Sequence, residues 1–337
     1  MLSFIIRRFL GAMAMLVVSS IVTFGIFFVL PKLAGQTTDQ LAATYAGKAP
    51  TQQAIDDIKV RLGLDEPIAV QYARFVEGVF VGKEFDNGPS EIWCPPPCLG
   101  YSFTTNEPVL PKLLDRAPVT LSLALGASVL WVVTGVGIGV LSALRRGSVF
   151  DRAAMVTALA GVSLPIYFTG LVSLAVFAYG LGLWPTGVRY VPFTENPVDW
   201  AYNLILPWVT LSFLYAALYA RLTRAGMLET LGEDYIRTAR AKGLPERTVI
   251  TRHALRASLT PILTVFGLDL GLLLGGAVLT ESTFGFAGLG ALSIQSIFTG
   301  DLPMVMGVVL LATLFVVLLN FLVDVLYAVV DPRVRLS

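Results

Sequence analysis

Two carboxylates that interrupt apolar stretches of the chain are the first residues whose positions suggest chemistry. Asp269 and Asp324 both lie where a charged side chain is costly in lipid, and such acids bind cations, relay protons or pair with a basic group. Asp269 lies well inside its stretch, so it is the stronger candidate for lining a polar pathway. Asp324 lies near the end of its stretch, and we expect it to pair with Arg333 or with a neighbouring subunit.

Catalytic and nucleotide-binding patterns are weak. His253 is the only histidine and has no plausible serine or cysteine nucleophile near it in the sequence, so we expect a structural role. The stretch from Gly78 to Lys83 has one residue too few between its glycines for a phosphate-binding loop. Glu84 also stands where a serine or threonine must reach Mg²⁺. We therefore expect a chain that is not an enzyme and has no cofactor or metal site of its own.

The composition is that of an integral membrane protein. Of 337 residues, 55% are hydrophobic and 14% charged, against about 25% charged in soluble proteins. Six stretches are long enough to cross a bilayer, which takes about 20 apolar residues. They are residues 9–30, 119–144, 153–180, 204–222, 259–280 and 304–330. The first is too long for the apolar core of a signal peptide and no cleavage site follows Pro31, so we expect a retained span.

Basic residues predict the orientation of these spans. Arginines accompany the N-terminus, the 145–152 connection and the C-terminus, and basic residues outnumber acids between Arg221 and Arg256. In residues 31–118 the acids are more numerous. The positive-inside rule then places both termini and loop 223–258 in the cytoplasm. The expected organisation is an N-terminal span (1–30), an extracytoplasmic segment (31–118), a five-span core (119–330) and a cytoplasmic tail (331–337).

The extracytoplasmic segment is expected to contain short helices. "TQQAIDDIKVRLGL", capped by Thr51, and "EPIAVQYARFVEGVF", which starts at Pro67, both have helical spacing of apolar residues. Cys94 and Cys98 flank three prolines. A trans polyproline run would place their Cα atoms about 12 Å apart, whereas a disulfide needs roughly 4.4–6.8 Å. A disulfide therefore requires a turn or a cis proline, and free thiols are the alternative.

The fifth apolar stretch has a stripe of small residues at Gly267, Gly271 and Gly275. Such a stripe lets helices approach closely, either around a pathway or inside one subunit. "ESTFGFAGLGALSIQSIFTGD" follows and is less helical in pattern, so we expect an irregular loop at the mouth of a pathway, buried or lining a cavity. Its Glu281 and Phe284 are candidate pathway or interface residues.

The loop between the fourth and fifth stretches predicts a docking element. Residues 233–242 form a candidate helix, with Glu233 and Asp234 in its first turn and Arg240 and Lys242 in its last. Gly243 stands at the left-handed C-cap position, Pro245 opens a second helix into the fifth span, and Glu233 is spaced to pair with Arg237. A stripe of Ile236, Ala239 and Gly243 is expected to face outward and to bind a cytoplasmic protein. A nucleic-acid partner is not expected.

The stretch "GEDYIRTARAKGLPERTVITRHALRASLTPILT" resembles the coupling loop of type I ABC importer permeases in the dipeptide/oligopeptide/nickel group. "IIRRFLGAM", "RLGLDEPIAVQYARFV", "SALRRGSVFDR", "SLPIYFTG", "GGAVLTESTFGFAGLG" and "DVLYAVVDPR" are similar to that group's B-type subunit. The general Glu-Ala-Ala signature is replaced by Arg237, Thr238 and Ala239, a variant similar to the peptide subgroup's. "KEFDNGPSEIWCPPPC" resembles an insertion.

This resemblance implies an all-α fold with six transmembrane helices in the cell membrane. It implies three kinds of partner: a homologous second permease, two cytoplasmic ATPases that bind ATP and Mg²⁺, and an extracytoplasmic, lipid-anchored substrate-binding protein. The cargo it implies is peptide, with nickel, glutathione or glycan as alternatives. An ion-coupled secondary transporter, suggested by Asp269 and Asp324, and a membrane enzyme are the rival classes. The implied ATPase-coupling residues are Glu233, Asp234, Tyr235, Ile236, Arg237, Ala239, Arg240, Lys242, Gly243 and Pro245.

Overall fold

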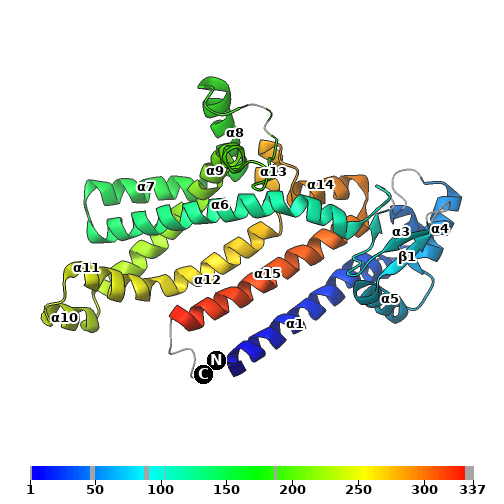
Figure 1. The fold of residues 1–337 in the computed structure, drawn as a ribbon, viewed down its shortest axis with the longest axis horizontal. Coiled ribbons are helices and arrows are strands. Elements are labelled where there is room, and N and C mark those ends of the chain that lie inside the picture. The colour runs from blue at the N-terminus through cyan, green and yellow to red at the C-terminus, as the bar shows by residue number, and fades with distance from the viewer. Residues whose placement is uncertain are drawn as a thin grey trace.

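The computed structural model describes residues 2–45, 50–86, 91–102, 104–185, 187 and 189–330. Its long helices run side by side (Figure 1). The segment that contains α3 (Thr38–Tyr45), α4 (Gln52–Leu62), α5 (Ile68–Val81) and β1 (Lys83–Asp86) lies at one end, and α10 (Asp234–Ala241) and α11 (Glu246–Thr248) lie at the other. The N-terminal end of α1 and the C-terminal end of α15 both point away from that segment.

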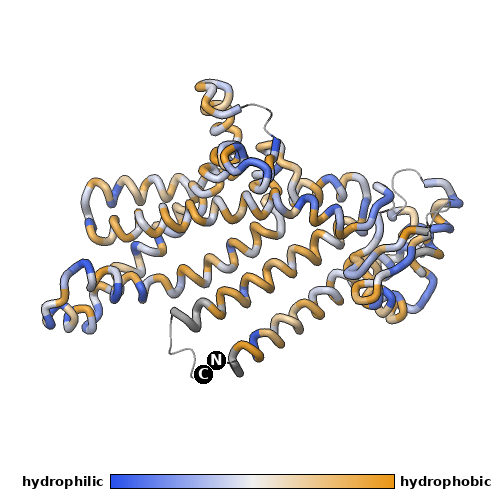
Figure 2. The backbone as a smooth tube through the Cα atoms, viewed as in Figure 1, coloured by the Kyte–Doolittle hydropathy of each residue, from blue (hydrophilic) through white to orange (hydrophobic). Residues whose placement is uncertain are grey.

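Five helical stretches of the described residues are long and apolar enough to cross a membrane. They are Ile5–Leu33, which joins α1 (Leu2–Phe24), the π-helical η1 (Gly25–Val29) and α2 (Leu30–Leu33); α6 (Val109–Leu144); α9 (Pro197–Leu231); Glu246–Leu274; and Leu302–Val323 of α15 (Leu302–Val330). Most residues of these helices are apolar, and hydrophilic residues gather around α10 and α11 and at the opposite end of the molecule (Figure 2). The helix α6 starts ten residues before the expected boundary at 119, so that domain boundary falls inside a helix.

The expected third span is not one straight helix. It divides into two helical pieces with an angle of 106° between them. The first is α7 (Val149–Ser163), and the second joins α8 (Ile166–Ser173) to the π-helical η2 (Leu174–Gly180). The break follows from Pro165, because the residue before a proline avoids the helical conformation. Leu164 is accordingly extended, with φ −89° and ψ 132°. The six-span expectation thus holds only if this bent pair counts as one span.

The fifth apolar stretch also ends earlier than expected. It consists of α11 (Glu246–Thr248), the π-helical η3 (Val249–Ala254) and α12 (Leu255–Leu274), and Gly276 then turns the chain with φ +136°. The following stretch was expected to be irregular and is instead helical, with α13 (Val278–Phe284) and α14 (Leu289–Thr299). The left-handed Gly285, with φ +74°, separates these two helices. Glycines are therefore the break points of this region, and its apolar residues still form helices.

The segment between the first two spans carries the expected helices and some strands. The helix α4 (Gln52–Leu62) is capped by Thr51, whose side chain accepts from the Ala54 amide, and α5 (Ile68–Val81) follows Pro67. Unexpected elements are α3 (Thr38–Tyr45) and two antiparallel strand pairs, β1 (Lys83–Asp86) with β2 (Glu91–Cys94) and β3 (Tyr101–Ser102) with β4 (Glu107–Pro108). The chain is therefore mostly helical and not strictly all-α.

The two cysteines are bonded in this structure. Cys94 and Cys98 form a disulfide with Cα atoms 5.6 Å apart, and the Pro96–Pro97 peptide bond is cis. Both cysteines are buried in a small cluster with Phe85 and Tyr101. The disulfide thus closes the end of the β1–β2 pair.

The main core lies where α6, α9 and α12 meet. Trp131 and Tyr219 are fully buried there together with Leu211, Ile262 and Leu270. The helices α6 and α9 approach closely at Gly135 and Gly139, where a Cβ atom would lie 2.7 Å and 2.5 Å from the Cβ atoms of Tyr219 and Thr223. This contact holds together the helices that position the candidate site.

Candidate functional site

The charged loop 223–258 contains a short helix that connects two spans and packs against them. The helix α10 (Asp234–Ala241) follows α9, and the loop from Lys242 to Pro245 leads into α11 and α12. Gly243 has φ +75°, the left-handed conformation expected of the residue after a helix. Arg240 donates to both carboxylate oxygens of Glu246, at 3.1 Å and 2.7 Å. This bidentate pair closes the turn between α10 and α11.

Two expectations about α10 are wrong. Arg237 pairs with Asp234, at 3.3 Å, and not with Glu233, which is the N-cap residue just outside the helix. The stripe of Ile236 and Ala239 faces inward, because Ile236 is fully buried and packs in a cluster with Met227 of α9 and Val249 of η3. Burying that stripe removes apolar surface from water, which is favourable.

The outward face of α10 is polar and aromatic. Its exposed residues include Asp234, Tyr235, Arg237 and Arg240, and Glu233, Lys242, Gly243 and Pro245 flank them. Tyr235 is 45% exposed although it is large and partly apolar. An exposed aromatic ring among basic side chains is a common arrangement in protein interfaces. A partner that contacts this face would touch a helix whose opposite face is packed on two spans.

Asp269 lies in a cluster of aromatic residues from α6, α9 and α12. The Tyr219 hydroxyl donates to its Oδ2 at 3.0 Å, and Trp131 stacks on Tyr215 with ring centroids 4.6 Å apart. Asp269 is half-buried, and Leu268 beside it is 52% exposed. No ion pair of Asp269 is found within the part of the chain that the structure describes. Since a carboxylate avoids lipid, this edge of α12 suits a polar pathway or a partner subunit.

The other candidate pathway residues are buried within this chain. Gly267, Gly271 and Gly275 face Val323, Val316 and Ala312 of α15, so the stripe is a contact inside the subunit. Phe284 is buried and packs edge-on against Trp184, with ring centroids 5.7 Å apart. These four residues thus form packing contacts in this structure.

Glu281 is fully buried and joins three helices. Its Oε1 accepts from the Thr120 hydroxyl at 2.6 Å and its Oε2 from the Ala291 amide at 2.9 Å. Thr120 Oγ1 accepts in turn from the Leu289 amide at 2.9 Å. These bonds satisfy amides of the first turn of α14, which have no partner inside the helix. Glu281 therefore acts as a cap that ties α13 and α14 to α6.

The sequence interpretation missed the ion pair between Asp151 and Arg224. Asp151 is 3% exposed and lies in the first turn of α7, while Arg224 extends from α9. A usable signal was that Arg224 follows the buried Thr223 in an otherwise apolar helix face that includes Ala220 and Met227. His253 is half-buried in η3, and the side chain of Asp324 and residue Arg333 lie outside the described parts.

Comparisons with known proteins identify a family and several relatives of this chain. Residues 135–336 match the family described as binding-protein-dependent transport system inner membrane component, and residues 1–124 match the family of its N-terminal part. A protein of Brucella abortus named as a peptide transport system permease protein is 38% identical over 335 residues, 99% of each chain. The dipeptide transport system permease protein DppB of Escherichia coli K12 is 35% identical over 357 residues, again 99% of each.

Two further comparisons extend this picture. The di/tripeptide transport system permease protein DppB of Pseudomonas aeruginosa is 40% identical over 294 residues, which cover 82% of this chain and 83% of that one. Among solved structures, the inward-facing MetNI methionine ABC transporter is similar with a TM-score of 0.51 and 21% identity. The match covers 66% of this chain and 97% of that one, and at this identity it supports the fold alone.

Proposed function

Because the chain belongs to the family of inner membrane components of binding-protein-dependent transport systems, we propose that it is the permease subunit of an importer for di- or oligopeptides. As a member of this family it is a multi-pass, non-catalytic protein of the inner membrane. The named relatives support the peptide cargo, because three of them are described as peptide, dipeptide or di/tripeptide permeases and two align over 99% of both chains.

The proposed assembly contains one homologous second permease, two cytoplasmic ATPases that bind ATP and Mg²⁺, and a lipid-anchored extracytoplasmic binding protein. A second permease is supported by Asp269, whose half-exposed carboxylate would otherwise face lipid. In this assembly Asp269 faces the pathway between the two permeases. The termini and α10 then lie in the cytoplasm, in keeping with the basic residues of loop 223–258.

The packing of α10 is the observation that carries the coupling role. Ile236 is buried against α9 and η3, and the Arg240–Glu246 pair fixes α10 to α11. A displacement of α10 by an ATPase would therefore move α9 and α12 together, since packed helices shift as units. We assign ATPase docking to the outward face of α10 around Tyr235 and Arg237. Gly243 makes the sharp turn after α10 that leaves this face exposed.

The test replaces Gly243 with glutamate in the complete importer. Gly243→Glu puts a charged side chain at a left-handed position beside the docking face, so we expect ATP-driven uptake of a labelled dipeptide into proteoliposomes to be lost. Gly182→Glu is the matched control, because Gly182 is also an exposed left-handed glycine, with φ +60°, in the loop after η2, and no atom lies within 4 Å of its Cβ position. Membrane insertion should be normal in both variants. Wild-type uptake by Gly243→Glu, with the control also normal, would contradict the coupling role.

The cargo needs a separate measurement. Uptake of labelled dipeptide, glutathione, nickel and short glycans, each measured separately in the same proteoliposomes, ranks the alternatives directly. We expect peptides alone to be taken up. Uptake of nickel or glutathione without uptake of peptides would reassign the cargo and leave the importer class unchanged.

A secondary transporter is the second candidate, favoured by the carboxylate of Asp269, which is hydrogen-bonded to Tyr219 and has no ion pair among the described residues. In that case the purified chain alone would accumulate substrate in response to a proton or sodium gradient. We expect no such uptake without the ATPases and ATP.

A further inference from the structure

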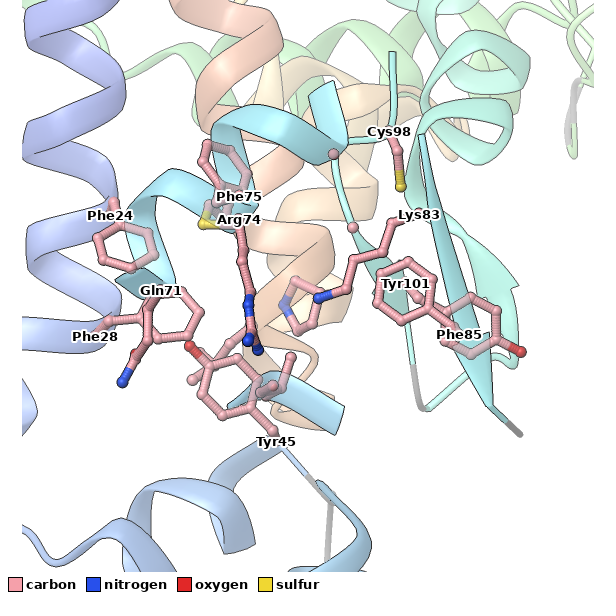
Figure 3. A pocket seen from close by; sticks show the side chains of 16 residues that line it. Phe24, Phe28, Tyr45, Gln71, Arg74, Phe75, Lys83, Phe85, Cys98 and Tyr101 are labelled. Atoms are coloured by element: carbon pink, nitrogen blue, oxygen red, sulfur yellow. The ribbon is translucent and has the colours of Figure 1, made fainter. Parts of the chain in front are cut away.

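A cavity lies between the first span and the segment that follows it (Figure 3). Its volume is about 70 Å³, and its walls carry six aromatic rings, from Phe24, Phe28, Tyr45, Phe75, Phe85 and Tyr101. Leu302, Pro303 and Met306 at the start of α15 close another side. A cavity of this size holds several waters or one small polar group, so a docked protein segment does not fit inside it.

Two cationic side chains enter this aromatic cavity. Figure 3 shows the Arg74 guanidinium and the Lys83 ammonium reaching into the space between the rings of Tyr45 and Tyr101. Arg74 donates to Glu66 at 2.8 Å, and that pair is charge-neutral. Lys83 has no ion pair or hydrogen bond to any residue of the described ranges, and its ammonium lies 5.2 Å from the centre of the Phe85 ring. The Lys83 ammonium therefore lacks a direct ion-pair partner among the described residues, although Glu66 and Glu77 act on it from a distance.

The environment of Lys83 opposes that charge. Burial, together with the positive charge of Arg74, lowers the pKa of the Lys83 ammonium below its usual value. A half-buried cation that lacks an anion is unfavourable, because taking it from water costs free energy that only a partner returns. An anion placed beside Lys83 and Arg74 would remove this penalty.

The cavity also contains an acceptor without a donor. Gln71 is 5% exposed, and its amide nitrogen donates to the carbonyl oxygens of Leu64, at 3.1 Å, and Glu66, at 2.7 Å. These two bonds fix the orientation of the amide and leave Oε1 buried with no hydrogen-bond partner among the described residues. A buried acceptor of this kind is costly until a donor reaches it. A fitting ligand thus has both an anionic group and a hydrogen-bond donor.

An apolar groove adjoins the cavity along the first span. It has a volume of about 600 Å³ and is lined by side chains of α1, η1, α2 and α5, among them Ile21, Ile26, Leu33 and Tyr72. Phe24 lines both the cavity and the groove, so the two lie next to each other at this residue. Ile26 is 52% exposed and Leu33 is 78% exposed, which leaves this face of the span open to an acyl chain.

We propose that the cavity and the groove together bind one phospholipid whose headgroup carries a hydrogen-bond donor, phosphatidylethanolamine or phosphatidylglycerol. The phosphate lies between Lys83 and Arg74, because phosphate accepts charge-assisted hydrogen bonds from both cations. The ammonium or hydroxyl group of the headgroup donates to Gln71 Oε1. One acyl chain follows the groove past Phe24 along α1. The bound lipid contacts both the first span and the segment that contains α3, α4 and α5.

The experiment is native mass spectrometry of the importer purified in detergent with its partner subunits, titrated with defined lipids. Lys83→Gln removes the unpaired charge and is expected to weaken binding of phosphatidylethanolamine by about tenfold or more, while Lys83→Arg retains it. Lys59→Gln is the matched control, since Lys59 lies on the same segment but pairs with Asp39 outside the cavity. Phosphatidylcholine, which has a phosphate and no donor in its headgroup, is expected to bind more weakly than phosphatidylethanolamine.

Each outcome decides one part of the proposal. Equal lipid binding by Lys83→Gln and wild type overturns the site, and equal binding of phosphatidylcholine and phosphatidylethanolamine overturns the role of Gln71. Displacement of the lipid by millimolar inorganic phosphate would identify a site for free phosphate. If Lys83→Gln does not fold, Arg74→Gln removes the second cation proposed to contact the phosphate, at a side chain that is 52% exposed. These readouts are independent of the cargo and of ATP-driven transport.

Discussion

Asp151 and Arg224 join α7 to α9 through two parallel hydrogen bonds, from Nε to Oδ1 at 2.6 Å and from Nη2 to Oδ2 at 2.9 Å. Asp151 Oδ2 also accepts from the Gly147 amide at 2.9 Å, so one buried carboxylate holds the α6–α7 turn and α9 together. Since α9 leads directly into α10, this pair fixes the base of the proposed coupling element.

Removing only one partner of this pair should destabilise the chain. Arg224→Met leaves the Asp151 carboxylate buried without its cation, whereas the double variant Asp151→Asn/Arg224→Met leaves no unpaired charge. We expect the single variant to unfold in detergent at a clearly lower temperature than the double variant. Identical unfolding temperatures for Arg224→Met and wild type would show that the pair contributes no stability.

The glycines of α6 give a matched pair of substitutions. A Cβ at Gly139 would lie 2.5 Å from Thr223 Cβ and 2.7 Å from the Ala220 carbonyl oxygen, whereas one at Gly137 meets nothing within 4 Å. We expect Gly139→Leu to lower the free energy of unfolding by about 2 kcal/mol or more, because overpacking forces the backbones apart. Gly137→Leu should change it by less than about 0.5 kcal/mol. Denaturant titration of the chain in detergent micelles measures both, and equal effects would contradict this packing.

Glu281 offers a test of the cap that joins α13, α14 and α6. Glu281→Ala leaves the Ala291 amide and the Thr120 hydroxyl without their acceptor, and we expect a loss of about 2 kcal/mol of stability. The α13–α14 connection should also become sensitive to protease. Glu229→Ala, which removes an exposed acid of α9, is the control and should have little effect. Unaltered protection of the connection in Glu281→Ala would refute the cap.

The disulfide makes a prediction about thiol reactivity. Cys94 and Cys98 should react with a maleimide only after reduction, as read by the mass of the intact chain. Cys94→Ser/Cys98→Ser should weaken the β1–β2 end of the segment by about 2 kcal/mol, since a short loop gains little from cross-linking. Its increased proteolysis would report this loss. Labelling of the native protein without reductant is the result that would exclude the bond.

Asp269 provides the test of the proposed pathway. Asp269→Asn keeps an acceptor for the Tyr219 hydroxyl and removes the charge, so packing should persist while ATP-driven peptide uptake falls by about tenfold or more. Tyr219→Phe keeps the charge and removes the hydrogen bond, and it should have the smaller effect. Wild-type uptake by Asp269→Asn would remove this residue from the pathway.

The expectations that succeeded rest on strong local signals. Thr51 at the start of α4, Pro67 before α5 and Gly243 after α10 each act on their own backbone, so their neighbours in sequence suffice to place them. The apolar stretches predicted the spans for the same reason, since length and hydropathy are local properties. The bend at Pro165 was not predicted, although its cause is also local, because a proline restricts the residue before it.

The expectations that failed depend on what a side chain meets. Ile236 and Ala239 form an apolar stripe whether the stripe faces outward or inward. Only the packing of α10 against Met227 and Val249 turns it inward. Gly267 allows close approach to some helix, but that helix is identified only by the packing of α12 on α15. Asp234 and Glu233 are both spaced to reach Arg237, and the start of the helix after Glu233 decides between them.

The sequence alone therefore determined the membrane class, the positions of most apolar stretches, the ends of α4, α5 and α10 marked by Thr51, Pro67 and Gly243, and the resemblance to importer permeases, because each is encoded by neighbouring residues. Tertiary structure decided the pairing of Asp151 with Arg224, the capping by Glu281 and the cavity around Lys83. These features join residues far apart in the chain, and the contacts exist only once long helices have packed. Burial then sets the energetic importance of each charge, because an unpaired group costs little in water and much inside the fold.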